Sequence, residues 1–222
     1  MEIQQKENGL RKKTDFKYDS ENIGPIAEQH LLNILASEGK RVEDISSIPA
    51  FRMFDIDIIE YEDDKLSYRD LLKEYYAGKD GRDLALKTYE CKTDTYGFNS
   101  RNIVYEDISN SNPGCMAKSR ADYVFYVFVD KDGRILEEYL IDLHALRWWL
   151  NINFDKINTE TFKKANAEGV VEDKLLIKSR SMRRGKDNTG IFLIDIDFLN
   201  QYSTMHKNEK YGEIVKSFKI YY

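Results

Sequence analysis

The apolar run from Tyr123 to Val129 constrains the fold of this chain more than any other segment. It forms the middle of the stretch ADYVFYVFVD, whose aromatic and β-branched residues favour a β-strand. The run is far too short to cross a membrane. The following segment KDGR (Lys131 to Arg134) is typical of a hairpin turn, so residues 135–141 are predicted to form a partner strand.

Predicted strands and helices alternate along the chain. Further strands are predicted from β-branched, alternating segments at residues 50–61 and 84–92, near 102–106 and from 190 onward. Helices are predicted from apolar periodicity and capping residues at 24–39, 67–77 and 142–151, with a short helical segment after Gly114 and a last helix capped by Asp197. This order predicts one α/β domain over residues 1–222, with an N-terminal arm (1–22) and a variable basic region (155–190).

The composition excludes several classes of protein. The net charge of −5 disfavours a protein held to DNA or to a membrane by its overall charge, although it leaves a local basic patch open. Cys91 and Cys115 have no CxxC spacing, so neither a disulfide framework nor a zinc ribbon is expected. The polar N-terminus lacks a signal-peptide pattern, and a cytoplasmic location is the expectation.

The candidate chemistry lies in carboxylates on predicted strands. Alternate residues of a strand share a face, so Glu90 and Lys92 are expected to project together, and so are Asp55 and Asp57. Carboxylates that converge from neighbouring strands would repel each other unless a divalent cation such as Mg²⁺ bound between them. Such a site suits phosphodiester hydrolysis, with the lysine beside the reacting phosphate. On their own, these pairs also fit solvated strand faces.

The order of these residues resembles that of the PD-(D/E)XK nucleases, which have a restriction-endonuclease-like fold. In that family a Glu often lies on the first helix, an Asp on the second strand and E-x-K on the third. Here Glu28 in GPIAEQHLLNIL, Asp57 in FDIDII, and Glu90 and Lys92 in YECKTD follow that order. The resemblance implies a central mixed β-sheet flanked by helices, with a small helical insertion between the second and third core strands.

A second stretch resembles a bacterial and phage subgroup of that family. The segments RNIVYE and GCMAKSRADYVFYV follow its pattern of GN, a hydrophobic residue and Glu, then G…S.ADY. Arg101 departs from the usual Gly. Asn102 and Glu106 match the pattern, either as structural residues or as support for the metal ligands.

The resemblance implies a role for each matching position. Asp57 and Glu90 would bind the metal, Mg²⁺ or its substitute Mn²⁺, together with the backbone carbonyl of Cys91. Lys92 would position the attacking water or stabilise the transition state, and Glu28 would hold a water or a second ion. Asp55 is the alternative to Asp57.

Nucleic acid binding requires cations that neutralise phosphates. The expected partner is DNA, with RNA and a homodimer left open. The candidate contacts are two basic segments, one predicted to be a mobile loop and one next to the ADY strand: Lys178, Arg180, Arg183, Arg184 and Lys186, and Lys118 and Arg120. The predicted function is a metal-dependent DNA nuclease. The alternatives are an inactive module of the same fold that binds nucleic acid or protein, and a protein-only regulator.

Overall fold

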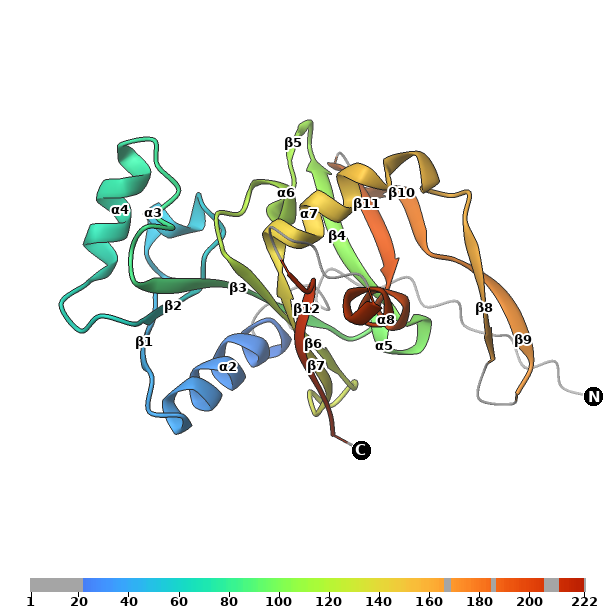
Figure 1. Cartoon of the computed structure of the whole chain (residues 1–222), viewed down its shortest axis with the longest axis horizontal. Helices are drawn as coiled ribbons and strands as arrows, with labels where there is room; N and C mark the ends of the chain where they lie inside the picture. The colour runs from blue at the N-terminus through green and yellow to red at the C-terminus, as the bar shows by residue number, and fades with distance from the viewer. Residues whose placement is uncertain (1–21, 166–168, 185–186, 206–211, 222) are drawn as a thin grey trace, which may run out of the picture.

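A mixed sheet of six strands forms the centre of the protein (Figure 1), in the order β1–β2–β3–β6–β7–β12. The computed structural model describes residues 22–165, 169–184, 187–205 and 212–221. The strands are β1 (Arg41–Asp44), β2 (Ile58–Tyr61), β3 (Leu86–Asp94), β6 (Tyr123–Val129), β7 (Ile135–Asp142) and β12 (Val215–Ile220). Among the described strands of this sheet, β3 and β6 are the only pair that is parallel. The prediction of an α/β fold with a central mixed sheet is confirmed; most of the predicted N-terminal arm lies outside the described residues.

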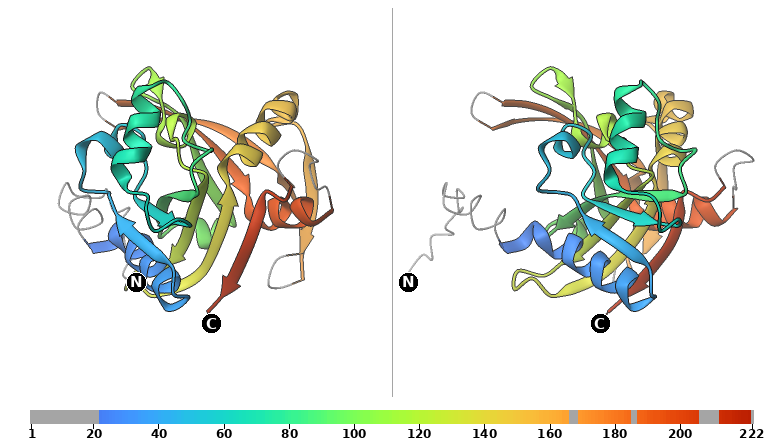
Figure 2. Two further views of the ribbon diagram at one scale, coloured as in Figure 1. Left: turned by 60° about the vertical axis from the view of Figure 1, so that its left-hand side comes forward. Right: turned by 90° about the vertical axis from the view of Figure 1, so that its left-hand side faces the viewer.

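Helices cover both faces of this sheet (Figures 1 and 2). They are α2 (Pro25–Ser37), α3 (Pro49–Arg52), α4 (Tyr68–Tyr76), α5 (Gly97–Ser100), α6 (Cys115–Lys118), α7 (Leu143–Ile152), the 3₁₀ helix η2 (Phe154–Lys156) and α8 (Ile196–Met205). As predicted, Asp142 caps α7, because its carboxylate accepts a hydrogen bond of 2.8 Å from the Ala145 N–H. Within the described residues, no helix is long and apolar enough to span a membrane.

The strand β6 is buried on both faces, which explains its continuous apolar sequence. Val124 and Phe128 belong to the larger apolar cluster, which includes residues of α7. Phe125 and Val127 belong to a second cluster, which lies under α2. The run that is most diagnostic in the sequence therefore lies between the two layers of helices.

The region 155–190 is not the loop that its polar sequence predicts. It contains β8 (Thr161–Ala165), β9 (Val171–Leu175), β10 (Ile177–Arg184) and the start of β11 (Asp187–Asp195). A second sheet has the order β10–β11–β4–β5, with β4 (Asn102–Ser109) and β5 (Asn112–Pro113), while β8 and β9 form a separate hairpin. Buried Ile177, Ile191 and Ile194 anchor the second sheet, and their apolar spacing is masked by the charged residues between them.

The prediction of one strand over residues 50–61 is wrong in its first half. Pro49 begins the short helix α3, and Phe51 is fully buried. The chain then turns, so that the Ile56 N–H donates to the Phe51 carbonyl, and β2 begins only at Ile58. Asp55 has a φ of 46°, in the left-handed region, so Asp55 and Asp57 do not alternate on one strand.

The predicted cap of the last helix is also wrong by two residues. The Phe198 N–H donates to the Asp195 carboxylate over 3.0 Å, so Asp195 caps α8. Asp197 instead pairs with Arg101, whose guanidinium also binds buried Glu137 at 2.7 Å. Arg101 has a φ of 57°, the conformation that favours glycine, at the position where the nuclease pattern has Gly.

Replacing Arg101 with alanine is expected to destabilise the protein. The variant leaves the Glu137 carboxylate buried, at 1% exposure, without its cation. Loss of one partner of a buried pair costs about 3 kcal/mol. Urea unfolding of Arg101→Ala should measure this loss, while Arg134→Ala, which removes an exposed ion pair, should leave the midpoint unchanged. Equal midpoints for the two variants would contradict the assignment.

Candidate functional site

The carboxylates of the predicted site line one open cavity of about 410 Å³. Its walls include Glu28, Asp57, Glu90 and Lys92. These residues come from α2, from the segment before β2, and from β3. The structure therefore brings together all four predicted catalytic residues, which are separated by up to 64 positions in the sequence.

The cavity lies where β2 ends and β3 continues. The pairing of β2 with β3 begins at Ile58 opposite Tyr89, whereas β3 runs on to Asp94. The backbone N–H of Asp57 donates to the Tyr89 carbonyl over 2.8 Å, and its carboxylate accepts from the Cys91 N–H over 2.7 Å. The Asp57 side chain therefore takes the next hydrogen bond that a longer β2 would have made.

Strand geometry also orients the Cys91 carbonyl. The N–H and C=O of one strand residue point to the same side, and the Cys91 N–H points toward Asp57. Its carbonyl oxygen therefore faces the same open edge of β3. The Cys91 side chain is buried in the apolar cluster under α2, as the strand alternation predicts.

Glu90 and Lys92 form an ion pair on the opposite face of β3. Glu90 is 3% exposed, and burial, reinforced by the nearby Asp57 charge, raises its pKa to about 7. Burial alone would lower the pKa of Lys92, but the Glu90 carboxylate raises it above its ordinary value. Lys92 is therefore a charged ammonium at neutral pH.

Helix α2 presents Glu28 from the other side of the cavity. Thr93 holds the start of this helix, because its hydroxyl accepts from the Ala27 N–H and donates to the Gly24 carbonyl, both over 3.1 Å. Burial and the charge of Asp57 raise the pKa of Glu28 to about 7. The pKa of Asp57 is also raised, mainly by burial. The three carboxylates thus share a site with excess negative charge.

Asp55 lines the same cavity but has a cation partner. Its carboxylate lies 3.2 Å from the Lys118 ammonium, and its backbone carbonyl accepts from the Ser119 hydroxyl over 2.8 Å. Burial nevertheless raises its pKa. Asp57, in contact with β3, is better placed than Asp55 to act with Glu90.

Glu106 and Asn102 do not line the cavity. Glu106 accepts a hydrogen bond of 2.9 Å from the Cys115 thiol. Asn102 is buried at the start of β4, and its Oδ1 has no hydrogen-bond partner among the described residues. Both of their expected roles, as structural residues or as support for the metal ligands, stay predictions.

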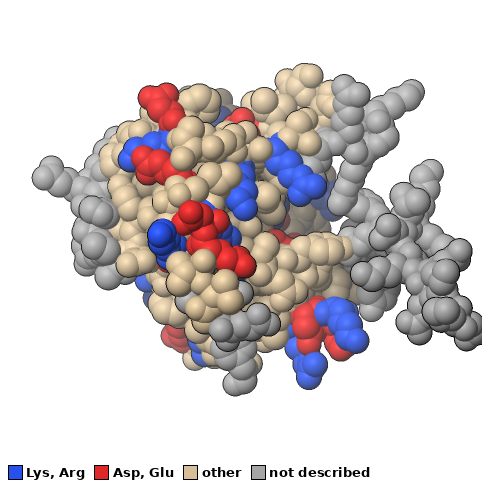
Figure 3. All heavy atoms as spheres, turned by 90° about the vertical axis from the view of Figure 1, so that its right-hand side faces the viewer, with Lys and Arg blue, Asp and Glu red and all other residues tan. Residues whose placement is uncertain are grey.

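The main basic segment lies away from this cavity. Lys178 and Arg180 lie on β10, and neither lines the acidic cavity. Arg183 and Arg184 end the same strand, while Lys186 lies outside the described residues. On the described surface in Figure 3, which carries β8 and β9, Lys and Arg are interspersed with Asp and Glu.

The second basic pair is much closer to the site. Lys118 pairs with Asp55 in the cavity wall, and Arg120 packs over the rings of Phe54 and Tyr75 at 4.8 and 5.0 Å. From the sequence, Lys118 and Arg120 were the second candidate for nucleic acid binding, after the longer basic segment. Their position next to the acidic cavity makes them the stronger candidate.

Two polar side chains of the cavity, those of Thr93 and Arg52, were not predicted as site residues. Thr93 anchors α2, and it could have been found from its position three residues after Glu90, on the Cys91 face of β3. Arg52 brings a guanidinium to the cavity from α3 and donates to the Ser46 carbonyl over 3.0 Å. No sequence signal identifies Arg52, because its segment was predicted to be a strand.

The donor set is small for a preformed metal site. Among the described residues, no group of three or more His, Cys, Asp or Glu side chains has metal-binding geometry. Mg²⁺ is usually held by one or two carboxylates, with waters and substrate oxygens completing its shell. Asp57, Glu90 and the Cys91 carbonyl oxygen fit that smaller requirement.

Comparison with known proteins gives no match to a family model, a curated protein or a solved structure. What the protein does is therefore inferred from the geometry of the site.

The buried carboxylates predict that the metal-free protein loses stability as pH rises. Burial raises the folded-state pKa values of Glu28 and Glu90 to about 7 from an ordinary 4.5, so the folded protein binds more protons than the unfolded chain between these values. The free energy of unfolding should fall by a few kcal/mol across this window, because each unit of pKa shift corresponds to about 1.4 kcal/mol. Urea titrations in EDTA at pH 5 and pH 8 measure the difference.

The matched control is Glu90→Gln, which removes one of the two groups. The variant should lose less stability between the two pH values than the wild type. If the wild type is equally stable at both pH values, or if the variant keeps the full difference, the assignment of raised pKa values to Glu28 and Glu90 is wrong.

Proposed function

We propose that this protein is a Mg²⁺-dependent nuclease that hydrolyses phosphodiester bonds of DNA. The observation that carries the proposal is the convergence of Asp57, Glu90 and Lys92 in one open cavity at the edge of β3. Two carboxylates next to a lysine ammonium form the arrangement expected for hydrolysis of an anionic phosphate.

The metal site would consist of Asp57, Glu90 and the Cys91 carbonyl. These are hard oxygen donors, which Mg²⁺ and Mn²⁺ prefer. Burial, with a smaller contribution from neighbouring carboxylates, raises the pKa of both groups, and a bound cation would favour their charged forms. When bound, the ion would polarise a phosphate oxygen and make a water more acidic.

Lys92 would stabilise the charge that develops on the scissile phosphate. Its ammonium contacts Glu90, and its side chain remains about one-third exposed toward the cavity. Because Glu90 raises its pKa, Lys92 carries its charge throughout the neutral range. It donates hydrogen bonds to a phosphate oxygen or orients the attacking water, and it does not act as a base.

Glu28 would act on the water side of the reaction. It lies on the first turn of α2, across the cavity from β3, and its carboxylate can accept a hydrogen bond from a water. The anchoring of Gly24 and Ala27 by Thr93 fixes the position of this turn relative to β3. Glu28 thus orients a water toward the phosphate bound beside Asp57 and Glu90.

The proposed fold is restriction-endonuclease-like. The element order α2–β1–β2–β3, followed by α6 and by β6 parallel to β3, agrees with the family order of helix, three strands, helix and strand. The strand β1 lies at a position where that order contains a strand, although the sequence did not predict it. Helix α4 lies between β2 and β3, at the place expected for the insertion.

Cleavage of labelled DNA in Mg²⁺ or Mn²⁺ tests the proposal. Asp57→Asn, Glu90→Gln and Lys92→Gln should each reduce the rate by about a hundredfold or more, because each removes charge stabilisation from the reacting phosphate. Glu62→Gln is a matched control, since Glu62 is half exposed in a surface ion pair and should retain the wild-type rate. Linear, nicked, branched and single-stranded substrates should be compared, together with RNA.

Two results would contradict the proposal. One is cleavage by Lys92→Gln and Glu90→Gln at the wild-type rate, which would indicate a contaminating nuclease. The other is the absence of cleavage on every substrate while DNA still binds, which would favour the inactive binding module.

A further inference from the structure

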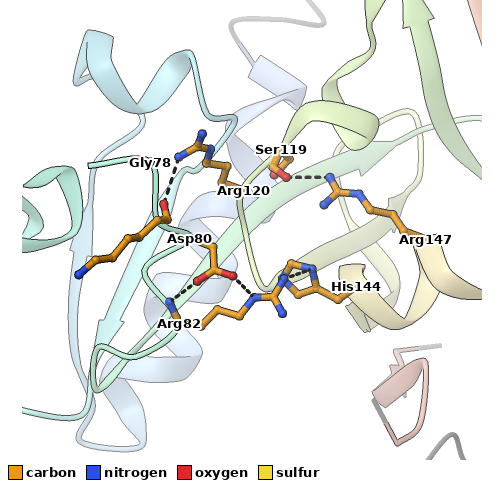
Figure 4. Close-up of a pocket in the computed structure, with 8 residues that line it drawn as sticks. Gly78, Asp80, Arg82, Ser119, Arg120, His144 and Arg147 are labelled. Atoms are coloured by element: carbon orange, nitrogen blue, oxygen red, sulfur yellow. Dashed lines mark hydrogen bonds and ion pairs between the residues drawn. The ribbon is translucent and has the colours of Figure 1, made fainter. Parts of the chain in front are cut away.

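A second cavity, of about 280 Å³, contains mainly cationic side chains (Figure 4). Three segments that are distant in the sequence form it. The loop after α4 provides Arg82, the segment after α6 provides Ser119 and Arg120, and α7 provides His144 and Arg147. None of these residues belongs to the acidic cavity described above.

Two guanidinium groups in this cavity carry uncompensated charge. Arg147 donates to the backbone carbonyls of Met116 and Ser119, over 3.1 and 2.7 Å. Arg120 donates to the Lys79 carbonyl over 3.4 Å and packs on aromatic rings. Neither has a carboxylate partner within the part of the chain that the structure describes. Carbonyl oxygens satisfy hydrogen bonds but do not cancel a full positive charge.

Arg82 and His144 add further donors. Arg82 pairs with Asp80 at 3.0 Å and donates to Nδ1 of His144 over 3.1 Å. Because a guanidinium can only donate, Nδ1 accepts and the ring proton of neutral His144 lies on Nε2. That Nε2 has no hydrogen-bond partner among the described residues and lies 3.8 Å from the Asp122 carboxylate. The excess positive charge of the cavity therefore comes from Arg120 and Arg147.

We propose that this cavity binds a phosphate group of a nucleic acid strand. Arginine guanidinium groups match the geometry of phosphate oxygens, and several of them around one small cavity favour an anion of this size. The inference rests on the proposed function, because it identifies a substrate phosphate next to the one that is cleaved.

One hydrogen bond joins the basic and acidic cavities directly. The Ser119 hydroxyl, in the basic cavity, donates to the carbonyl of Asp55, in the acidic cavity, over 2.8 Å. The Arg120 N–H donates over 2.8 Å to the carbonyl of Phe54, the residue before Asp55. A nucleic acid strand that runs from the basic cavity to the acidic cavity would place one phosphate on the arginines and a nearby phosphate beside Asp57. The insertion that contains α4 would then contribute to substrate binding, because the loop after α4 carries Arg82 to the basic cavity.

DNA binding measured without cleavage tests this inference. The probe is fluorescently labelled single-stranded DNA, titrated with protein in Ca²⁺ by fluorescence anisotropy at several salt concentrations. Arg120→Gln and Arg82→Gln should each weaken binding by roughly three- to tenfold and reduce the salt slope by about one, because each removes a phosphate contact. Arg69→Gln, an exposed arginine on the same insertion, is the matched control and should bind as the wild type does.

Two forms of the probe distinguish the source of the phosphate. A loss of affinity confined to DNA with a 5′-phosphate, and absent with a 5′-hydroxyl, assigns the cavity to a strand end. An equal loss on circular single-stranded DNA assigns it to an internal phosphate. Either result supports the inference.

The outcome is separable from that of the proposed function. If the wild type cleaves DNA but folded Arg82→Gln and Arg120→Gln bind every probe as tightly as Arg69→Gln does, the phosphate site is wrong and the nuclease remains. If no cleavage occurs but both variants lose affinity, the phosphate site stands and the nuclease fails. Circular dichroism confirms that each variant is folded.

Discussion

The hydrogen bond from the Cys91 N–H to the Asp57 carboxylate determines how the acidic cavity is built. Just before Asp57, the backbone no longer pairs with β3, and the Asp57 side chain accepts the hydrogen bond from the Cys91 N–H in its place. The edge of β3 beyond that point is left open, and Glu90, Cys91 and Lys92 lie along it. A longer β2 would have covered this edge with backbone, so the turn at Asp55 is what makes the site accessible.

The alternation of side chains along β3 gives the strand one apolar face that packs and one charged face that lines the site. Tyr89 and Cys91 are buried in the apolar cluster under α2. Glu90 and Lys92 point to the other face, where they neutralise each other in part. This division permits two charged residues in the middle of a central sheet, because the apolar face supplies the packing that holds the strand.

Sequence patterns predicted the elements whose periodicity is undisturbed. The strands β3, β6 and β7 and the helices α2, α4 and α7 lie close to their predicted positions. The structure also brings the predicted catalytic residues into one cavity, and strand alternation places Glu90 and Lys92 on the same face of β3. The metal and the reaction remain proposals.

The errors arise where tertiary contacts override local pattern. Burial of Phe51 turns the expected strand into α3 and a turn, and this changes the relation of Asp55 to Asp57. Pairing with β11 orders β10, whose basic and polar residues resemble a loop. Of the arginines in the basic cavity, only Arg120 could be predicted from the sequence, because Arg82 and Arg147 share no sequence spacing with it and meet it only in the fold.

The charge distribution is consistent with a nuclease despite the net charge of −5. Acidic groups converge at one cavity, where a divalent cation would compensate them. Three guanidinium groups converge at the next, and those of Arg120 and Arg147 have no carboxylate partner among the described residues. A net negative surface limits non-specific coating of DNA, so affinity would depend on these two local sites and on the ion.

Anomalous diffraction from crystals soaked in Mn²⁺ tests the central claim most directly. If Asp57, Glu90 and the Cys91 carbonyl oxygen bind the metal, one strong manganese peak is expected within bonding distance of them, with Lys92 displaced from its pair with Glu90. A well-ordered cavity without a manganese peak, with the pair between Glu90 and Lys92 intact, would show that these residues do not form a metal site.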